Sequence, residues 1–394
     1  MKKVMYRITL TVLAFGIGIA LVMALTYAGQ KSSGPIEDAV TTIGTKVTEI
    51  EHEVVVSTQE KSRADYLSWF QPYRIGTYRI SHPDTILWGA YDNTQSDSYE
   101  PIVALEDTLH MKFAVVQIYS AWGSKPDERF PFNQAKAIYD LGSIPMITWE
   151  PWLNDFDNEK FPTKGDITNR NWGGMKAIAA GEYDAYIDEW AGRVKTFGAN
   201  IYLRLGHEMN DPYRYPWGPQ NNKPEEYIAA WKHVHDRFIA AGAKNVQWIW
   251  SPHPAYRQFN EYYPGDAYVD WIGIPTLNYG TVAPWSQWWS FNDIFGVYYD
   301  SLAVFKKPVM LSEIGCLRVG GSREKWFADA LANLPVRYPL VKAILFYHSN
   351  NDNTTMDKTL DWTLLRDKPT IQAIRTAVSR WKLPPMHQPA VKTP

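Results

Sequence analysis

Two glutamates, Glu208 and Glu313, stand just after apolar runs that read as buried strands. The first lies in the segment 206–210, after Ile201–Leu205, and the second follows Val309–Leu311. Two carboxyl groups facing each other across a sugar-sized cleft are what retaining glycoside hydrolysis needs: one protonates the leaving oxygen, and the other attacks the anomeric carbon, with the two groups about 5–5.5 Å apart. A single glutamate at a strand end is more often a salt-bridge partner or a helix cap. The pair, rather than either residue alone, indicates catalysis.

The elements that must position this pair alternate along the chain from Tyr73 onward. Short apolar runs are followed by helical periodicity, as in 183–197 and 224–241. Strand–helix repetition requires a parallel sheet, and eight units favour an α/β fold, the (β/α)₈ TIM barrel. A doubly wound open sheet is the alternative, but no Gly-x-Gly-x-x-Gly motif or phosphate-binding loop follows a strand. The candidate strands are Ile86–Ala90, Phe113–Ile118, Ile144–Thr148, Ile201–Leu205, Val246–Trp250, Trp271–Ile274, Val309–Leu311 and Val341–Phe346.

Strands four and seven lie on opposite sides of an eight-stranded barrel, so Glu208 and Glu313 face each other across its mouth. Chemistry in such barrels is carried by the carboxyl ends of the strands. Those ends are polar and aromatic almost without exception. The barrel therefore predicts one site that both glutamates share.

Composition excludes several classes of protein. The 394 residues include 40 basic and 42 acidic side chains, a net charge of −2, and this balance argues against nucleic-acid binding. Hydrophobic residues at 45% and charged residues at 21% are typical of a globular chain. With one cysteine, Cys316, neither an intramolecular disulfide nor a cysteine-rich zinc site can form.

The N-terminal segment, residues 1–30, predicts a transmembrane anchor. Residues 8–29 form an uncharged, apolar segment that is long enough to span a bilayer. Lys2, Lys3 and Arg7 precede it. The positive-inside rule then leaves the N-terminus in the cytoplasm and the remaining chain outside, at the cell membrane. The alternative is a signal peptide cleaved near Ala28, which would give a secreted protein.

The rest of the chain divides into three parts. Residues 31–68 are interpreted as a polar spacer that holds the main domain away from the membrane. The (β/α)₈ domain is expected over residues 69–384. Residues 385–394 are expected to form a disordered tail.

Aromatic residues crowd the predicted rim of the barrel and favour stacking on sugar rings. Core packing is the competing reading, and it is expected for Trp190, Trp231 and Trp326, which lie on helical stripes. The rim residues are Trp149, Trp152, Trp172, Tyr213, Tyr215, Trp217, Trp285, Trp288 and Trp289.

Histidines near strand ends raise the question of a metal. His207, His253 and His348 lie at such ends, and Asp92 could join them. No His-x-His or His-Glu-x-x-His spacing occurs, so the sequence predicts neither a metal site nor a cofactor. Imidazole contacts to sugar hydroxyls explain these residues better.

The segments 204–210 and 213–218, reading Arg-Leu-Gly-His-Glu-Met-Asn and Tyr-Arg-Tyr-Pro-Trp-Gly, resemble the acid/base signature of glycoside hydrolase family 26. That family contains β-mannanases, mixed-linkage β-glucanases and some β-xylanases. The segments 223–236, 246–252, 263–273 and 307–315 are similar to its following elements, so that the resemblance covers about residues 80–380.

The resemblance implies that Glu208 is the general acid/base and Glu313 the nucleophile. It implies that His207 binds the sugar or the nucleophile, that Tyr279 donates to Glu313, and that Arg204 lies beneath Glu313 as a positive neighbour. Such neighbours lower a nucleophile's pKa, whereas the acid must stay protonated. The other expected substrate-binding residues are Trp152 on the glycone side, Tyr213 on the aglycone side, and Trp217, Asn210 and His348.

Two departures from the family pattern put mannan specificity in doubt. Asp211 stands where glycine usually follows the His-Glu-Met-Asn motif, and residues 347–351 replace a Trp-Arg pair after the last strand. We therefore expect a retaining endo-β-glycanase acting on β-1,3-1,4-glucan, β-mannan or a bacterial exopolysaccharide. The alternatives are a non-catalytic carbohydrate-binding barrel and an accessory subunit of a membrane complex for polysaccharide synthesis or export.

Overall fold

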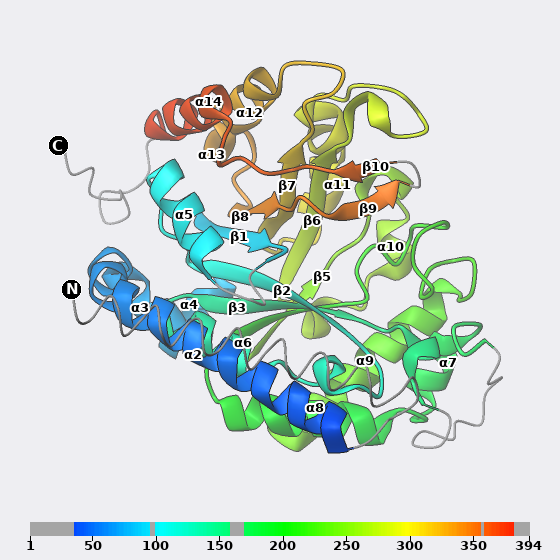
Figure 1. Cartoon of the computed structure of the whole chain (residues 1–394). Helices are drawn as coiled ribbons and strands as arrows, with labels where there is room; N and C mark the ends of the chain where they lie inside the picture. The colour runs from blue at the N-terminus through cyan, green and yellow to red at the C-terminus, as the bar shows by residue number, and fades with distance from the viewer. Residues whose placement is uncertain (1–34, 95–98, 158–168, 356–357, 382–394) are drawn as a thin grey trace, which may run out of the picture. The chain divides into compact units, whose positions relative to one another are not determined.

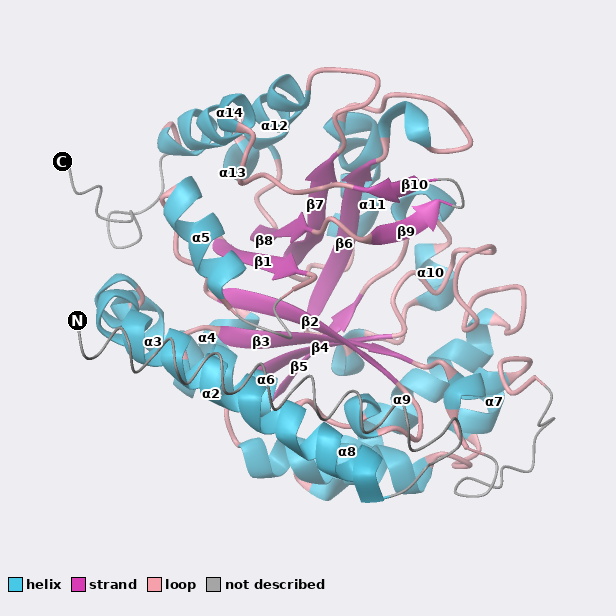
Figure 2. Cartoon of the chain, in the orientation of Figure 1, coloured by secondary structure: helices cyan, strands magenta, loops and turns pink. Residues whose placement is uncertain are grey.

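Eight parallel strands close into a barrel in which β1 pairs with both β2 and β8 (Figures 1 and 2). The computed structural model describes residues 35–94, 99–157, 169–355 and 358–381. The chain divides into two compact units, residues 1–50 and 51–394, and the barrel belongs to the second. The strands follow one another around the barrel in sequence order, which confirms the predicted (β/α)₈ architecture.

Several strands extend beyond their apolar runs toward the mouth of the barrel. The sequence predicts the seventh strand as Val309–Leu311, but it continues to Cys316, so that Glu313 lies inside the strand rather than after it. Polar residues at these ends remain in the ladder because the neighbouring strands supply their hydrogen bonds. The barrel strands are β1 (Leu87–Asp92), β2 (Val115–Ala121), β3 (Ile144–Glu150), β4 (Ile201–Leu205), β5 (Val246–Trp250), β6 (Trp271–Asn278), β7 (Val309–Cys316) and β8 (Val341–His348).

Helices surround the barrel and a short antiparallel pair of strands follows β8 (Figure 2). The pair is β9 (Asp352–Thr355) and β10 (Lys358–Leu360). The helices described are α2 (Pro35–Tyr66), α3 (Gln71–Ile75), α4 (Thr77–Ser81), α5 (Glu100–Leu109), α6 (Phe132–Asp140), α7 (Gly174–Ala179), α8 (Asp184–Phe197), α9 (Pro224–Ala241), α10 (Phe259–Tyr262), α11 (Val297–Ala303), α12 (Arg323–Leu331), α13 (Leu334–Arg337) and α14 (Lys368–Ser379).

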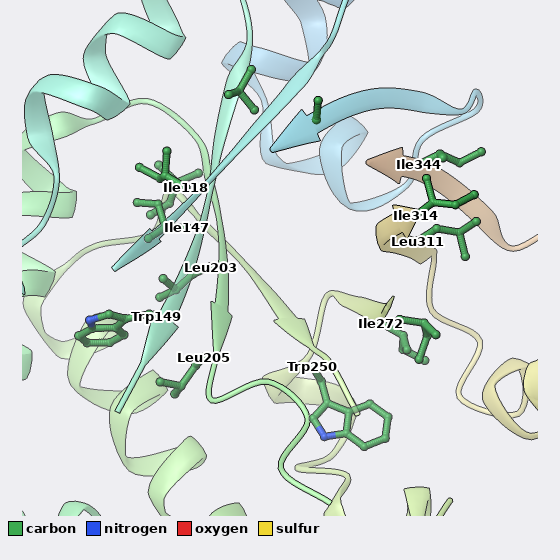
Figure 3. Packing of buried hydrophobic residues seen from close by; sticks show 14 of the residues in the cluster. Ile118, Ile147, Trp149, Leu203, Leu205, Trp250, Ile272, Leu311, Ile314 and Ile344 are labelled. Carbon is green, nitrogen blue, oxygen red and sulfur yellow. The ribbon is translucent and has the colours of Figure 1, made fainter. Parts of the chain in front are cut away.

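The core has two layers because successive strand residues point to opposite faces. Leu203 belongs to a large cluster between strands and helices, of which Figure 3 shows part. Its neighbour Tyr202 belongs to a separate cluster, in which it packs edge-on against Trp271 with ring centroids 5.5 Å apart. That second cluster also contains Phe70 and Ile80, so the segment before β1 closes the amino-terminal end of the barrel.

The predicted spacer differs in the structure from a solvated tether. Helix α2 occupies most of residues 31–68, and from residue 51 onward it belongs to the same unit as the barrel. Val55 is buried in the main cluster, and the His52 ring lies 4.7 Å from the ring of Tyr99. Arg63 is buried, pairs with Glu106 and donates to the backbone oxygen of Leu141 (2.6 Å). Apolar and basic residues at helical spacing therefore extend the domain toward the N-terminus.

The predicted transmembrane segment, within residues 1–30, lies outside the described residues, as does the predicted tail, 385–394. Among the described residues, no helix combines the length and the apolar character needed to cross a bilayer.

The ion pair of Arg63 gives a prediction about stability. Arg63→Ala would leave the Glu106 carboxylate buried without its closest cation, so we expect the free energy of unfolding to fall by about 3 kcal/mol. Urea unfolding followed by tryptophan fluorescence measures the change. Arg79→Ala, which removes an exposed arginine of α4, serves as the control. Equal stabilities for the two variants would contradict the role assigned to Arg63.

Candidate active site

Glu313 lies at the mouth of the barrel, held by a buried cation and a phenol. The Arg204 guanidinium donates from Nη2 to Glu313 Oε1 (2.5 Å), and the Tyr119 hydroxyl donates to the same oxygen (2.8 Å). Arg204 is fully buried on β4 and also donates to Thr148 Oγ1 (2.9 Å) and Ser312 Oγ (3.1 Å). A buried guanidinium requires a carboxylate partner, and Glu313 supplies it to Arg204.

A β-bulge in β7 makes this arrangement possible. Ile274 of β6 is opposite Leu311, but Pro275 is opposite Glu313, which leaves Ser312 as an extra residue. The pairing with β8 shifts at the same place. Adjacent residues of a regular strand point to opposite faces, whereas Ser312 and Glu313 both contact Arg204. The bulge re-aims the carboxylate, as bulges beside active sites commonly do.

Glu208 is placed by a tight turn after β4. Gly206 has φ 48° and Glu208 has φ 51°, a left-handed conformation that is uncommon for a residue with a side chain. The turn is tied to the next strand, because the Glu208 N–H donates to the backbone oxygen of Ser251 (2.6 Å). The strained backbone conformation is therefore at Glu208 itself, and it sets the direction of the Glu208 carboxyl group.

The environment of Glu208 differs from that of Glu313. Burial raises the pKa of Glu208 to about 7, and the Arg214 guanidinium, whose Nη1 lies 3.5 Å from Glu208 Oε2, opposes part of that rise. Within the described residues, Oε2 accepts no hydrogen bond. A carboxyl group with a pKa of about 7 can both release and recover a proton near neutral pH.

A third carboxyl, Glu150 at the end of β3, lies beside the pair. Burial raises its pKa to about 7, although the Trp152 indole donates to its Oε2 (3.1 Å). His207 Nδ1 lies 3.9 Å from Glu150 Oε1, and it has no hydrogen-bond partner among the described residues. Burial lowers the pKa of His207 far below its usual value, and nearby arginines lower it further, so the imidazole is neutral. Glu150 and His207 together offer a donor and acceptors to a sugar hydroxyl.

His348, at the end of β8, forms a buried pair with Asp92 at the end of β1. Its Nδ1 lies 2.6 Å from Asp92 Oδ2, while its Nε2 has no partner in the described part of the chain. Burial raises the pKa of Asp92, but hydrogen bonds from His348 and Thr94 outweigh it and hold the pKa below its ordinary value. The Asp92 carboxylate accepts the hydrogen on Nδ1 and fixes the orientation of the imidazole ring.

Two expected substrate contacts serve the site indirectly. Trp217 is 1% exposed, and its indole donates to the His207 backbone oxygen (2.6 Å), which braces the turn that carries Glu208. The Asn210 amide donates to the backbone oxygens of His253 (2.8 Å) and Arg257 (2.9 Å). These side chains position loops rather than face a ligand.

The hydrogen bond expected from Tyr279 to Glu313 comes instead from Tyr119, on β2. Tyr279 follows β6 and packs edge-on against Trp362, with ring centroids 5.0 Å apart. Among the described residues no hydrogen bond joins Tyr279 to Glu313. Tyr119, Glu150 and Arg214 all lie at strand ends or in the Glu208 loop, and that position was the signal in the sequence that could have identified them.

The rim aromatics divide into two groups. Tyr213 is 80% exposed, Trp152 is half-buried, and Trp172, Trp285 and Trp289 are exposed, so these five can meet a polymer. Trp149 is fully buried in the core against Trp190 and Trp122, because β3 turns its side chain outward under the helices. Trp190, Trp231 and Trp326 are buried, which confirms core packing for them.

Three side chains of the site could ligate a cation. Ligand atoms of Glu208, Asp211 and His253 lie within 4.8 Å of one another, and burial lowers the pKa of His253 to about 4, which keeps it neutral. Arg214 already supplies a positive charge to Glu208, and it competes with a metal there. The chemistry of this cluster is accounted for without an ion.

Comparisons with known proteins agree with this geometry. A family model described as Glycosyl hydrolase family 26 matches residues 134–320. Endoglucanase H of Acetivibrio thermocellus is 32% identical over 74% of this chain, and a mannan endo-1,4-beta-mannosidase of Bacillus subtilis is 28% identical over 39%. The chain spans 30% and 40% of the length of these two relatives. A solved β-mannanase from Bacteroides ovatus shares the fold, with 19% identity, a TM-score of 0.52, and coverage of 77% of this chain and 90% of that one.

The raised pKa of Glu150 predicts a pH dependence of stability. A carboxyl with a pKa of about 7 in the folded state, above its value in the unfolded chain, holds its proton more tightly when folded. Its contribution is therefore complete below about pH 4 and is lost as the pH rises through 7. The free energy of unfolding of the wild type should fall between pH 5 and pH 8. In Glu150→Gln this fall should be about 2 kcal/mol smaller than in the wild type.

Urea unfolding at a series of pH values measures this difference. Glu324→Gln, at an exposed position of α12, is the matched control and should keep the wild-type slope. Identical slopes in Glu150→Gln and wild type would show that this carboxyl is ionised in the folded protein at pH 5.

Proposed function

Because a model of glycosyl hydrolase family 26 matches residues 134–320, we propose that the chain belongs to this family and hydrolyses β-linked polysaccharide as a retaining endo-β-glycanase. The observation that carries the proposal is the contrast between two buried carboxyls. Glu313 is paired with Arg204 and Tyr119, whereas Glu208 is buried without a hydrogen bond to its Oε2 among the described residues. One group is suited to attack and the other to proton donation.

In the first step the Glu208 carboxyl donates its proton to the glycosidic oxygen while a carboxylate oxygen of Glu313 attacks the anomeric carbon. The bond to the leaving sugar breaks, that sugar departs as an alcohol, and a glycosyl ester forms on Glu313. Arg204 and Tyr119 hold Glu313 in position and become the partners of the ester oxygen. The neutral His207 and Glu150 lie close enough to bind hydroxyls of the same sugar.

In the second step Glu208, now a carboxylate, takes a proton from water. The oxygen of that water attacks the anomeric carbon, the ester bond to Glu313 breaks, and the sugar leaves with its original anomeric configuration. Arg214, near Glu208, stabilises the carboxylate between the two steps and limits how far burial raises its pKa. The same residue therefore serves as acid and then as base.

The substrate classes proposed are β-1,3-1,4-glucan, β-mannan and a bacterial exopolysaccharide. The exposed aromatics in the loops after β4 and β6, Tyr213 and Trp285 among them, support a long polymer with several sugar rings bound. His348 ends β8, pairs with the buried Asp92 of β1, and belongs to the segment 347–351 that replaces the Trp-Arg pair of the family's mannanases. This replacement favours glucan or exopolysaccharide over mannan.

We also propose that residues 1–30 anchor the chain in the cell membrane, with the N-terminus in the cytoplasm and the barrel outside. The support is the uncharged segment 8–29 with basic residues before it. An anchored hydrolase would act on a glycan close to the membrane, and a complex for polysaccharide synthesis or export is the partner that fits this placement.

The proposed mechanism predicts that Glu208→Ala and Glu313→Ala lose activity on the substrate that the wild type cleaves. Removal of an acid/base typically costs 10²–10⁴-fold, and removal of a nucleophile stops the covalent step. The full-length chain is incubated with β-mannan, β-1,3-1,4-glucan, cellulose, β-xylan and the polysaccharide of the host, and the products are sized by chromatography. On an aryl glycoside, whose leaving group departs without an acid, azide needs no general base and should restore turnover in Glu208→Ala.

Glu324→Gln, an exposed carboxyl of α12, is the control and should cleave at the wild-type rate. A wild-type chain that binds these polymers without cleaving any, or alanine variants as active as wild type, would reject the mechanism and favour a carbohydrate-binding barrel.

The proposed anchor predicts that the chain recovered from membranes is intact. Mass spectrometry of the membrane fraction should find the full 45.2 kDa chain, and protease added outside the cell should digest the barrel. A chain that begins after Ala28 and is found in the medium would establish cleavage instead.

A further inference from the structure

Helix α2 carries an apolar stripe that no described residue covers. Val47, Ile50 and Val54 are 50%, 59% and 55% exposed, although each is a large aliphatic side chain. Their spacing of three and four residues places them along one side of the helix. A stripe of this kind on a long helix is unusual for a protein surface and marks a contact with another element.

The stripe has the spacing of a coiled coil. Going back along the sequence, apolar residues continue at alternating intervals of three and four, so that they fill successive a and d positions of a heptad repeat. Every a position is valine and every d position is isoleucine, and the pattern ends at Ser57 and Lys61. The a positions are Val40, Val47 and Val54, and the d positions are Ile36, Ile43 and Ile50.

Charges beside the stripe fit a parallel pairing of two copies. Lys46 falls at a g position and Glu51 at the following e position, and both residues are exposed. In a parallel coiled coil a g residue faces the e residue five positions later on its neighbour, so Lys46 of one copy meets Glu51 of another. An antiparallel pairing sets g against g and e against e, and this match would be lost.

The opposite side of the helix is already occupied. In the unit that begins at residue 51, His52, Val55 and Arg63 are buried against the barrel domain. Arg63 follows Val54 by nine residues, about two and a half helical turns, and so lies on the other side of the helix. The helix can therefore pack on its own domain with one face and on a second helix with the other.

We propose that α2 forms a parallel coiled coil with α2 of other copies of this chain, through residues 36–54. Isoleucine at the d positions packs poorly in two-stranded coiled coils and shifts the preference toward three strands, so the expected assembly is a trimer. Three heptads give a short seam, and confinement of the chains at one membrane would strengthen their association by raising the effective concentration.

The mass of the full-length chain in detergent tests the proposal. Light scattering after size exclusion should give three times the 45.2 kDa chain mass for wild type and a single chain mass for Ile50→Glu. Val336→Glu, at an exposed valine of α13, is the matched control and should remain oligomeric. If Ile50→Glu unfolds at the same midpoint temperature as the wild type, the variant is folded.

Cysteine cross-linking tests the parallel register. A cysteine at a d position lies next to the same residue of its neighbour in a parallel assembly, so Ile50→Cys should form a disulfide-linked dimer under mild oxidation. Cys316 is buried and should not react, and Ile75→Cys, exposed on α3, controls for random collisions. A monomeric wild-type chain, an oligomer that survives Ile50→Glu, or cross-linking no faster at position 50 than at 75 would each overturn the proposal.

Discussion

A positive charge buried inside the barrel is the constraint on which the site depends. Arg204 has no exposed surface, and such a cation is tolerated only with a carboxylate partner and further acceptors. Its contacts tie β4 to Thr148 on β3 and to Ser312 and Glu313 on β7. The extra residue in β7 lets two adjacent side chains reach the same guanidinium. One ion pair therefore fixes the register, the bulge and the direction of the carboxylate together.

Burial raises the pKa of the two neighbouring carboxyls. Glu208 and Glu150 lack a partner as close as Arg204 is to Glu313, so the low-dielectric surroundings raise the pKa of each to about 7. The pKa values of Glu208 and Glu150 therefore depend on how far each carboxyl lies from the nearest arginine. Arg214 gives Glu208 a weaker and partly exposed cation, which is compatible with a group that must both release and recover a proton.

Loops far apart in the sequence brace this arrangement. The Arg214 side chain that approaches Glu208 also donates to Thr354 in β9. Trp217 and Asn210 donate hydrogen bonds to backbone oxygens of the loops around the Glu208 turn. Before β1, the segment that contains Phe70 and Ile80 closes the other end of the barrel, and Arg63 fastens α2 to it. Apolar side chains therefore fill the amino-terminal end of the barrel, and the ionisable groups of the site lie at its carboxyl-terminal end.

By itself, the sequence determined the barrel and placed Glu208 and Glu313 at its mouth, because hydrophobic period and strand-end polarity are local signals. The place of Arg204 beside Glu313 followed from the resemblance to the family, and the structure has that contact. The sequence misjudged Trp149 and Trp217 as rim residues and assigned to Tyr279 the hydrogen bond that Tyr119 makes. Which face a tryptophan takes, and which phenol reaches a carboxylate, depend on strand register and on a one-residue bulge. Those are set by long-range packing and pairing between strands, so only the tertiary structure could decide them.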